Sequence, residues 1–405
     1  MKKTELVLPA GSFKKAEFAF LYGADACYAG LAKYSLRKAE VDFTIPQLKK
    51  GINLAHSLGK NFYITFNVFA KNNYLSALKK DLKNIAKFKP DAFIVADPGV
   101  FDLVKKNTKI PIHISTQANT ANWQGAKFWK DQGAKRVVLA RELTLSEIAE
   151  IHKKVPGIEL EVFVHGAMCI SYSGRCLLSA VMTGREANQG DCAQPCRWKY
   201  KIFLEEEKRK GEYFEAAEDD TGTYVFNSKD LRLIKYIPQI IESGVSALKI
   251  EGRNKTEYYL STIARAYRKA INSYYADTFA KEIKELEKET EKVAHREYTT
   301  GFIFNKAKRG ETYNKRGPIE NYSFLGTVLS TIKKEAALVP RNQIKKGDLI
   351  EILSPDLVYK DKIYKIRNKE GEYLDNLNPL PSQEKFFLTL SQEYPKNSFI
   401  RKKIK

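Results

Sequence analysis

Four of the five cysteines of this 405-residue chain fall in one glycine-rich stretch of 28 residues. They are Cys169, Cys176, Cys192 and Cys196, and six, fifteen and three residues separate them. Thiolate sulfur is a soft ligand that prefers zinc, copper(I) or iron-sulfur clusters. Four thiolates complete the set for a structural zinc or for a four-iron, four-sulfur (4Fe-4S) cluster. The crowding of these cysteines therefore predicts a metal site.

The spacing of the cysteines favours the iron-sulfur cluster over zinc. Structural zinc sites usually have a tight ligand pair at each end, and only Cys192 and Cys196 form such a pair. A cluster can instead be held by loops whose ligands lie far apart in the sequence. Zinc is the alternative metal, and a disulfide pair or buried reduced thiols are the alternatives without a metal. The fifth cysteine, Cys27, lies in an apolar run, and we expect it in the core.

A second group of polar residues follows the apolar runs of the first 255 residues. If these runs are the strands of a barrel, their carboxyl ends meet at one rim, where the active sites of such barrels lie. Arg141 and Arg253 could each bind a carboxylate or phosphate with a planar fork, or could pair with a neighbouring glutamate. His165 could donate a proton or orient a ligand. The full set is Asn67, Asp97, Gln117, Arg141, Glu142, His165, Glu251 and Arg253.

The elements that would position these residues alternate between short apolar runs and longer amphipathic ones. This alternation is typical of strand-helix units around a parallel sheet, so we expect an α/β fold, a (β/α)8 TIM-type barrel. Nine runs are strand candidates although such a barrel has eight strands. We therefore expect one of them to belong to a hairpin inserted after the cysteines, between residues 199 and 226. The candidates are residues 5–10, 26–30, 61–67, 91–97, 110–116, 136–140, 160–164, 223–228 and 247–252.

The pattern changes after Arg253. A long charged helix ends near residue 295, an irregular basic stretch follows, and then short alternating runs are separated by Gly and Pro. These runs predict a small antiparallel β-barrel of about 85 residues. We therefore expect three parts, which are a (β/α) barrel over 1–300 with the cysteine-rich loop at 166–196, a basic linker over 301–320 and a small basic β-barrel domain over 321–405.

The chain carries a large excess of positive charge. Lys and Arg number 69 against 48 Asp and Glu, which gives a net charge of +21 and a pI near 9.4. This excess predicts an anionic partner such as RNA, although a solvated lysine-rich surface is the alternative reading. Basic clusters in the last quarter of the chain are candidate phosphate contacts. They include Lys306, Lys308, Arg309, Lys315 and Arg316, and the terminal Arg401, Lys402, Lys403 and Lys405.

Aromatic residues of the last domain have a more ordinary expected role. Phe324, Tyr359, Tyr364 and Phe387 are expected in the core or on strand faces rather than as platforms for stacked bases.

No apolar run reaches the roughly eighteen residues that a membrane span needs. The first thirty residues also lack the features of a secretory signal. We therefore expect a cytoplasmic protein, and reducing conditions there favour metal binding over disulfides.

The string EVFVHGAMCISYSGRCLLS at 161–179 is similar to the diagnostic signature of the collagenase-like peptidase family, number thirty-two among peptidases of unknown catalytic type (peptidase U-32). The resemblance covers nearly the whole chain. Further matching stretches lie at 8–30, 115–122, 140–148, 227–231, 248–253 and 295–302.

This resemblance implies a fold, a cofactor and an activity. The better understood members carry a four-cysteine 4Fe-4S cluster and catalyse oxygen-independent hydroxylation of tRNA wobble uridine, of rRNA cytidine or of a quinone precursor. Older descriptions call them proteases. The length and the basic carboxyl-terminal domain most resemble the branch that hydroxylates tRNA, for which prephenate is implied as a co-substrate.

The expected function is therefore the formation of 5-hydroxyuridine at the wobble position of tRNA. The nucleotides of an anticodon loop are unpaired, so a base can leave its stack at low cost. We expect catalytic roles for His165, Arg141, Glu142 and Glu251, substrate binding by Asn67, Gln117 and Arg253, and cluster binding by the four clustered cysteines.

A collagenase-like peptidase is the competing function. The sequence contains no HExxH and no GxSxG motif, and it has only five histidines. His165 and Cys169 are the one histidine-cysteine pair close in sequence, and a cysteine that binds metal is a poor nucleophile. Peptidase chemistry is therefore the weaker expectation.

Overall fold

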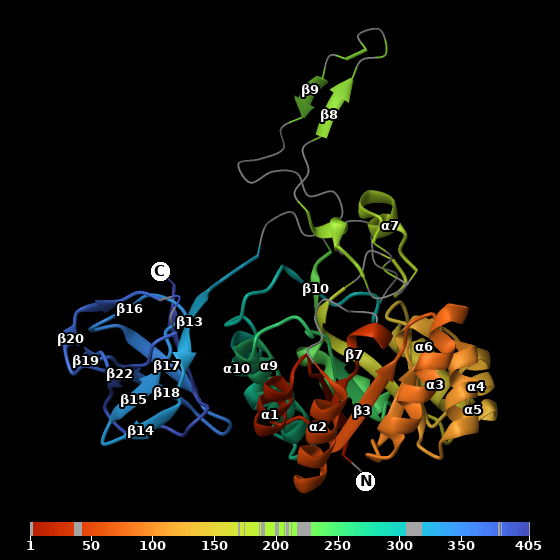
Figure 1. The fold of residues 1–405 in the computed structure, drawn as a ribbon, viewed down its shortest axis with the longest axis horizontal. Helices are drawn as coiled ribbons and strands as arrows, with labels where there is room; N and C mark the ends of the chain where they lie inside the picture. The colour runs from red at the N-terminus through yellow and green to blue at the C-terminus, as the bar shows by residue number, and fades with distance from the viewer. Residues whose placement is uncertain are drawn as a thin grey trace.

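Eight parallel strands close into a barrel in the computed structural model of the chain (Figure 1). The order around the ring is β11-β1-β2-β3-β4-β5-β6-β7, and pairing of β7 with β11 closes it. The predicted fold class is confirmed. The strands are β1 (Glu5–Pro9), β2 (Ala26–Ala29), β3 (Asn61–Phe66), β4 (Ala92–Val95), β5 (Ile112–Ile114), β6 (Arg136–Val138), β7 (Glu159–Ala167) and β11 (Ala247–Ile250). The structure describes residues 3–404 apart from 36–42, 169–170, 174, 186, 188–190, 199–201, 206, 208–209, 212, 217–227, 305–317, 380 and 382.

Helices cover the outside of the barrel. Sequence signals fix several of their starts, since Thr44 and Thr144 each form a capping box with the Gln or Glu three residues later. Asp97 caps α4 (Pro98–Asn107) through its side chain alone, because its carboxylate accepts a hydrogen bond from the N–H of Val100 at 2.9 Å. The helices are α1 (Phe13–Leu21), α2 (Ile45–Ser57), α3 (Asn72–Ala86), α4 (Pro98–Asn107), α5 (Trp123–Gln132), α6 (Leu145–Lys154), α8 (Ile237–Glu242), α9 (Glu257–Tyr275) and α10 (Phe279–Thr290). In the part of the chain that the structure describes, no helix is long and apolar enough to cross a membrane.

The ninth strand candidate falls almost wholly outside the described residues. It covered residues 223–228, and 223–227 lie outside the described residues. The next strand, β10 (Asp230–Arg232), runs antiparallel to β7 and continues the sheet sideways to β12 (Tyr298–Thr299). A hairpin does follow the cysteines, because β8 (Ile202–Glu205) and β9 (Tyr213–Ala216) pair antiparallel and project above the barrel in Figure 1. Neither of these two strands is one of the nine candidates, so the expectation that a candidate belongs to the hairpin stays a prediction.

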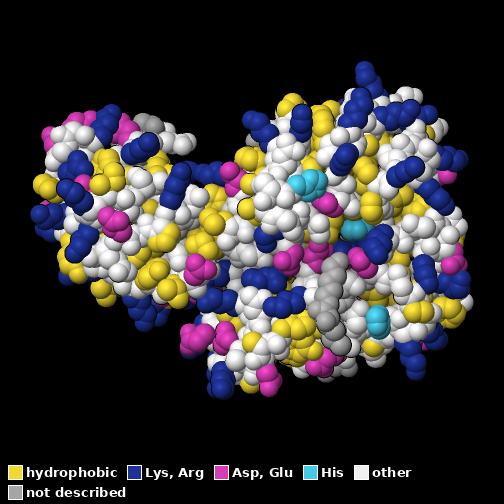
Figure 2. Space-filling view, turned by 90° about the horizontal axis from the view of Figure 1, so that it is seen from below, with side chains coloured by type: hydrophobic (Ala, Val, Ile, Leu, Met, Phe, Trp, Pro, Cys, Tyr) yellow, Lys and Arg dark blue, Asp and Glu magenta, His cyan; other side chains and the backbone are white. Residues whose placement is uncertain are grey.

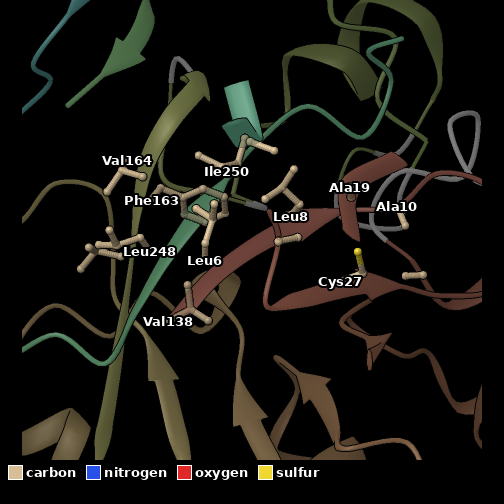
Figure 3. Close-up of a cluster of buried hydrophobic side chains, with 14 of the residues drawn as sticks. Leu6, Leu8, Ala10, Ala19, Cys27, Val138, Phe163, Val164, Leu248 and Ile250 are labelled. Carbon is tan, nitrogen blue, oxygen red and sulfur yellow. The ribbon is translucent and has the colours of Figure 1, made fainter. Parts of the chain in front are cut away.

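Apolar side chains between strands and helices form the main core. Figure 3 shows part of it, in which Leu6 and Leu8 of β1 lie beside Leu248 and Ile250 of β11. Cys27 is fully buried in the same core, as expected, and burial raises the pKa of its thiol. Because successive side chains of a strand point to opposite faces, the alternate residues fill the inside of the barrel.

The inside of the barrel contains buried charges near the amino ends of the strands. Arg136 binds Glu5 at 2.6 Å, Glu159 at 2.7 Å and Glu161 at 2.9 Å. Lys249 binds the other oxygen of Glu161 at 2.6 Å. These residues come from β1, β6, β7 and β11, so one ionic cluster joins the strands at which the ring closes. No local sequence pattern indicates this cluster, because its members lie on four separate strands.

The carboxyl-terminal part of the chain forms antiparallel sheets around a core of its own. One sheet has the order β13-β23-β17-β18 and another has the order β14-β15-β22-β19-β20, while β16 and β21 form a short pair. The strands are β13 (Tyr322–Thr327), β14 (Ser330–Ile332), β15 (Glu335–Leu338), β16 (Ile344–Lys345), β17 (Leu349–Leu353), β18 (Val358–Lys362), β19 (Lys365–Arg367), β20 (Tyr373–Leu374), β21 (Asn376–Leu377), β22 (Phe386–Thr389) and β23 (Phe399–Lys403).

The first of these sheets docks on the barrel through a buried ion pair and aromatic side chains. Arg401 of β23 has no exposed surface and binds Glu289 of α10 and Glu351 of β17, each at 2.8 Å. Phe399 packs against Phe18 of α1 with ring centroids 5.1 Å apart. The terminal basic cluster is therefore not the uniform phosphate-binding surface that the sequence indicated.

That correction has a physical cause. Arg401 lies in the domain interface because its carboxylate partners are 112 and 50 positions away in sequence, where no local pattern shows them. Lys402 binds Asp348 at 2.8 Å, Lys403 is exposed, and Lys405 lies outside the described residues. On the face seen from below, Figure 2 shows Lys and Arg spread over both domains rather than gathered in one patch.

Replacing Arg401 with Met should destabilise the protein strongly, because the buried Glu289 and the partly buried Glu351 would share Lys292 as their remaining counter-charge, at 3.2 and 2.8 Å. Breaking a buried pair in this way costs about 3 kcal/mol or more of unfolding free energy. Lys403→Met is the matched control and should change stability by less than about 0.5 kcal/mol, as exposed substitutions do. Chemical denaturation of both variants measures the difference, and equal stabilities would contradict the buried role of Arg401.

Candidate active site at the carboxyl ends of the barrel strands

An arginine-glutamate pair lies where β6, β7 and β11 end. Arg141 approaches Glu251 at 3.6 Å, and its Nη1 donates to the carbonyl oxygen of Ala167 at 2.8 Å. Its guanidinium lies 3.9 Å from the ring centre of Phe163, a cation-π contact. Both charged side chains are only 8 % exposed. Arg141, which follows β6, is therefore held by contacts with β7 and with the residue after β11, and these contacts fix the plane of its guanidinium.

A second arginine enters the same rim from the end of β11. Arg253 is 4 % exposed, and its Nη1 donates to the hydroxyl of Ser35 beyond β2. Its guanidinium lies 5.4 Å from the ring centre of Tyr28, and its backbone oxygen accepts a hydrogen bond from Lys15 at 3.2 Å. The two arginines predicted from sequence thus both reach the carboxyl-end rim.

Amide and hydroxyl groups form a third part of the rim, at the ends of β3 and β5. Asn67 Nδ2 lies 3.3 Å from Gln117 Oε1 and 3.4 Å from Ser115 Oγ, and Ser115 donates to Gln117. Asn67 and Gln117 were expected here, whereas Ser115 was missed. Its position directly after β5 could have indicated it. This group offers donors and acceptors of the kind that read the edge of a base.

A glycine lets the ends of β7 and β11 approach closely. Gly166 has φ +106°, and a Cβ there would lie 2.4 Å from the backbone oxygen of Glu251. The pairing of these strands also shifts register between Lys249 and Ile250. Only glycine fits this contact, so Gly166 fixes the separation of Ala167 from Glu251, the two residues that Arg141 contacts.

His165 lies on β7 but faces away from the pair. Its ring is 1 % exposed and packs against Tyr267 of α9, whose hydroxyl lies 3.3 Å from Nδ1, and against Tyr298 of β12. Its Nε2 has no hydrogen-bond partner among the described residues. Burial lowers the pKa of His165 to about 3, so the imidazole is neutral near pH 7. This position fits the orienting role better than proton donation from a charged ring.

Glu142, the next predicted catalytic residue, is half-buried beside Arg141. Burial raises the pKa of its carboxyl above the ordinary value, although backbone N–H groups and Arg141 act in the opposite direction. A carboxyl with a raised pKa is a better proton donor at neutral pH. Asp97, by contrast, serves as a helix cap and does not join this set.

The cysteine segment leaves the barrel at the end of β7. Arg175 stacks over Phe69, just beyond β3, at 4.9 Å, which places the neighbourhood of Cys176 at the same rim. Cys176 and Cys196 are half-buried, and Cys192 is exposed. The N–H of Gln194 donates to the sulfur of Cys192 at 3.4 Å, the kind of contact that stabilises a thiolate or a cluster sulfur.

The four-cysteine metal site stays a prediction. Cys169 lies outside the described residues, and among those described no three His, Cys, Asp or Glu side chains form a metal-binding group. The donor set still fits a cluster in its chemistry, because three cysteines that form no disulfide lie on one short segment and the sulfur of one of them already accepts a backbone N–H.

Comparison with known proteins gives a consistent result over both domains. Residues 11–313 match Peptidase family U32, and residues 320–401 match Peptidase family U32 C-terminal domain. The tRNA hydroxylation protein P of Escherichia coli (strain K12) is 40% identical over 92% of this chain and 91% of its own length. The tRNA hydroxylation protein P1 of Bacillus subtilis (strain 168) is 38% identical over 92% of this chain and 89% of its own length. A 23S rRNA 5-hydroxycytidine synthase of E. coli is 31% identical over 82% of this chain and 49% of its own.

Because His165 is buried, we expect its ring to stay neutral at pH values well below the usual histidine pKa. Its pKa is about 3 in the folded protein and near 6.5 in an unfolded chain. The unfolded state therefore takes up the proton first, and the stability that this group contributes is lost as the pH falls from about 6.5 towards 3. NMR of ring-labelled histidine, with His165→Gln to assign the signal, should show no titration of His165 above about pH 5. A midpoint near 6.5 would mean that the ring is solvated.

Proposed function

Because the chain belongs to peptidase family U32 and is similar over both domains to proteins that hydroxylate tRNA, we propose that it is an RNA-modifying enzyme that hydroxylates a tRNA base. The observation that carries the proposal is the 40% identity to tRNA hydroxylation protein P over 92% of the chain. The similarity to an rRNA 5-hydroxycytidine synthase supports the same class of reaction on a pyrimidine.

We further propose that the target is the wobble uridine and that the product is 5-hydroxyuridine. The reacting carbon of a stacked base is out of reach of a site inside a barrel rim, so the base has to leave its stack. The unpaired nucleotides of an anticodon loop allow this at low cost. The chain's net charge of +21 supports a polyanionic substrate.

The rim residues supply complementary parts of such a site. Arg141 and Arg253 present planar forks suited to a phosphate or to a dicarboxylate co-substrate, which would be the source of the hydroxyl group. Asn67 and Gln117 offer amide groups to the Watson-Crick edge of the base. Burial raises the pKa of Glu142, which suits its carboxyl to proton transfer, and Glu251 orients Arg141.

A 4Fe-4S cluster would be held by Cys169, Cys176, Cys192 and Cys196 and would supply electron transfer for the oxidation of the base. Arg175 stacked on Phe69 supports this placement, because it ties the segment to the rim where the arginines lie. Zinc is the less favoured metal, because structural zinc sites usually have two tightly spaced ligand pairs and only Cys192 and Cys196 form one.

No observation in the described residues favours peptidase activity. A cysteine nucleophile needs a histidine base within hydrogen-bond reach. The Nδ1 of His165 faces the hydroxyl of Tyr267, and its ring packs among tyrosines behind β7. The peptidase name of the family therefore does not carry over to a proposed activity.

Nucleoside analysis of tRNA tests the proposal. A strain that lacks this gene should lose 5-hydroxyuridine and its derivatives, and the wild-type gene should restore them. Arg141→Lys keeps the charge but loses the planar fork, so it should lower the modified nucleoside at least tenfold. Its iron content should stay at the wild-type value, because Arg141 does not bind the cluster. Full modification by Arg141→Lys would remove the arginine from the site.

Cysteine variants separate the cofactor from the fold. Cys176→Ser should lose most of the iron of anaerobically purified protein and the modification together, whereas Cys27→Ser, the buried control, should keep both. A colourless protein with one zinc per chain would contradict the cluster. Unchanged tRNA in the deletion strain, together with cleavage of gelatin by the purified protein, would contradict RNA hydroxylation itself.

A further inference from the structure

The second sheet of the carboxyl-terminal domain, β14-β15-β22-β19-β20, carries an ordered row of side chains on one face. The register pairs Ser330 of β14 with Ala337 of β15, Ala337 with Phe387 of β22, Phe387 with Arg367 of β19, and Arg367 with Tyr373 of β20. Cross-strand partners lie on the same face of a sheet. The row therefore places one aromatic ring on either side of an arginine, with two small residues beside Phe387.

A cavity of about 300 Å³ lies over this row. Because Ser330 and Ala337 are small, the ring of Phe387 is not covered by a neighbour of its own size on that side. The cavity is open to solvent, and Ile332 beside it is 70 % exposed. Its lining residues are Ser330, Ile332, Lys333, Glu335, Ala337, Arg367 and Phe387.

The arginine in the row is held flat. The guanidinium of Arg367 lies 4.5 Å from the ring centre of Phe387. Glu335 accepts hydrogen bonds from its Nε at 3.3 Å and from its Nη2 at 2.8 Å. A carboxylate fork of this kind fixes the plane of the guanidinium. The planar stack is thus formed before any ligand binds, which lowers the entropic cost of binding one.

The charge around the stack favours an anion. Lys333 borders the cavity and is exposed, and Lys365 lies next to Arg367, with its Nζ 5.2 Å from the ring centre of Tyr373. Glu335 is the one acidic residue among those that line the cavity. Tyr373 itself is 64 % exposed. Arg367 is paired with Glu335, and Glu393 accepts a hydrogen bond from the N–H of Lys333 at 2.9 Å. The attraction for an anion therefore comes from Lys333 and Lys365, beside the exposed ring of Tyr373 and the half-buried ring of Phe387.

We propose that this sheet face binds an unpaired nucleotide of the RNA substrate, with the base stacked on the Phe387–Arg367 platform and the flanking phosphates on Lys333 and Lys365. Stacking on aromatic rings and on guanidinium planes, combined with a positive surface, is how proteins hold single-stranded RNA. This inference rests on the proposed function for the identity of the RNA. It adds a binding site on the second domain, separate from the barrel rim.

The choice of RNA over an acidic peptide follows from the flat surfaces. Carboxylates of a peptide would use the lysines but would leave the open faces of Phe387 and Arg367 without a planar partner. Every nucleotide carries both a π-face and a phosphate, so it satisfies both parts of the site. Phe387 was expected in the core or on a strand face, and its position on the face that lines the cavity is what makes stacking possible.

Fluorescence anisotropy with the full-length protein and a labelled oligouridylate of about twelve nucleotides tests the site. Phe387→Ala should weaken binding at least fivefold, because it removes the platform. Arg367→Lys keeps the charge, does not disturb the core, and should weaken binding by a similar factor. Neither change should alter the salt dependence. The double change Lys333→Ala and Lys365→Ala should instead lower the slope of log affinity against log salt by about 1.4, roughly 0.7 for each lost phosphate contact.

Matched controls use residues of the same kind elsewhere. Phe128→Ala on α5, where the ring is 53 % exposed, and Lys403→Ala should leave affinity unchanged. Wild-type affinity in both Phe387→Ala and Arg367→Lys would overturn the site, as would displacement of the RNA by oligoglutamate as efficiently as by oligouridylate. The oligouridylate assay requires no turnover. A negative result there, with tRNA hydroxylation intact in cells, would reject this sheet face and leave the proposed function standing.

Discussion

The ionic cluster around Arg136 inside the barrel is the interaction on which the rest of the structure depends. Its guanidinium binds Glu5 of β1 and Glu161 of β7, and Glu161 also binds Lys249 of β11. Burial raises the pKa of Glu161, but Lys249 and Arg136 outweigh it, so the pKa lies below its ordinary value and the carboxylate stays charged. Charges this deeply buried are tolerated only when each has a partner. The cluster therefore favours one arrangement of the strands that close the ring.

The candidate site follows from that arrangement. With β7 and β11 fixed at their amino ends, their carboxyl ends bring Gly166 against Glu251 and leave Ala167 as the acceptor for Arg141. The cluster also occupies the inside of the barrel near the amino ends of these strands with paired charges. The polar groups available for a substrate are consequently at the opposite rim, which is the end where barrel enzymes place their chemistry.

Much of this was predictable from the sequence, because strand patterning and strand ends are local features. The rule that carboxyl ends converge was enough to place Asn67, Gln117, Arg141 and Glu251 at one rim, but the pairing of Asn67 with Gln117 and of Arg141 with Glu251 came only from the structure. Asp97 also follows a barrel strand, but it serves as a helix cap. A polar residue between a strand and a helix can either face the active site or cap the helix, and its position in the sequence does not distinguish the two roles.

The failures have a common physical cause, which is pairing between distant residues. Arg136, Glu161 and Lys249 lie in three separate strands far apart in the sequence, and only closure of the barrel brings them together. Charged residues within largely apolar strands were the available signal. Arg401 was assigned to a basic tail for the same reason, because both of its glutamate partners lie far away in the chain.

The central claim is that the target nucleotide meets the protein at the carboxyl-end rim of the barrel. Photocrosslinking of tRNA that carries 4-thiouridine at the wobble position, followed by mass spectrometry of the crosslinked peptides, tests it most directly. The account predicts crosslinks in the segments that follow β3, β5, β6 and β11, at residues 67–71, 115–119, 141–144 and 251–255. Crosslinks confined to the carboxyl-terminal domain, or to loops at the amino ends of the strands, would contradict it.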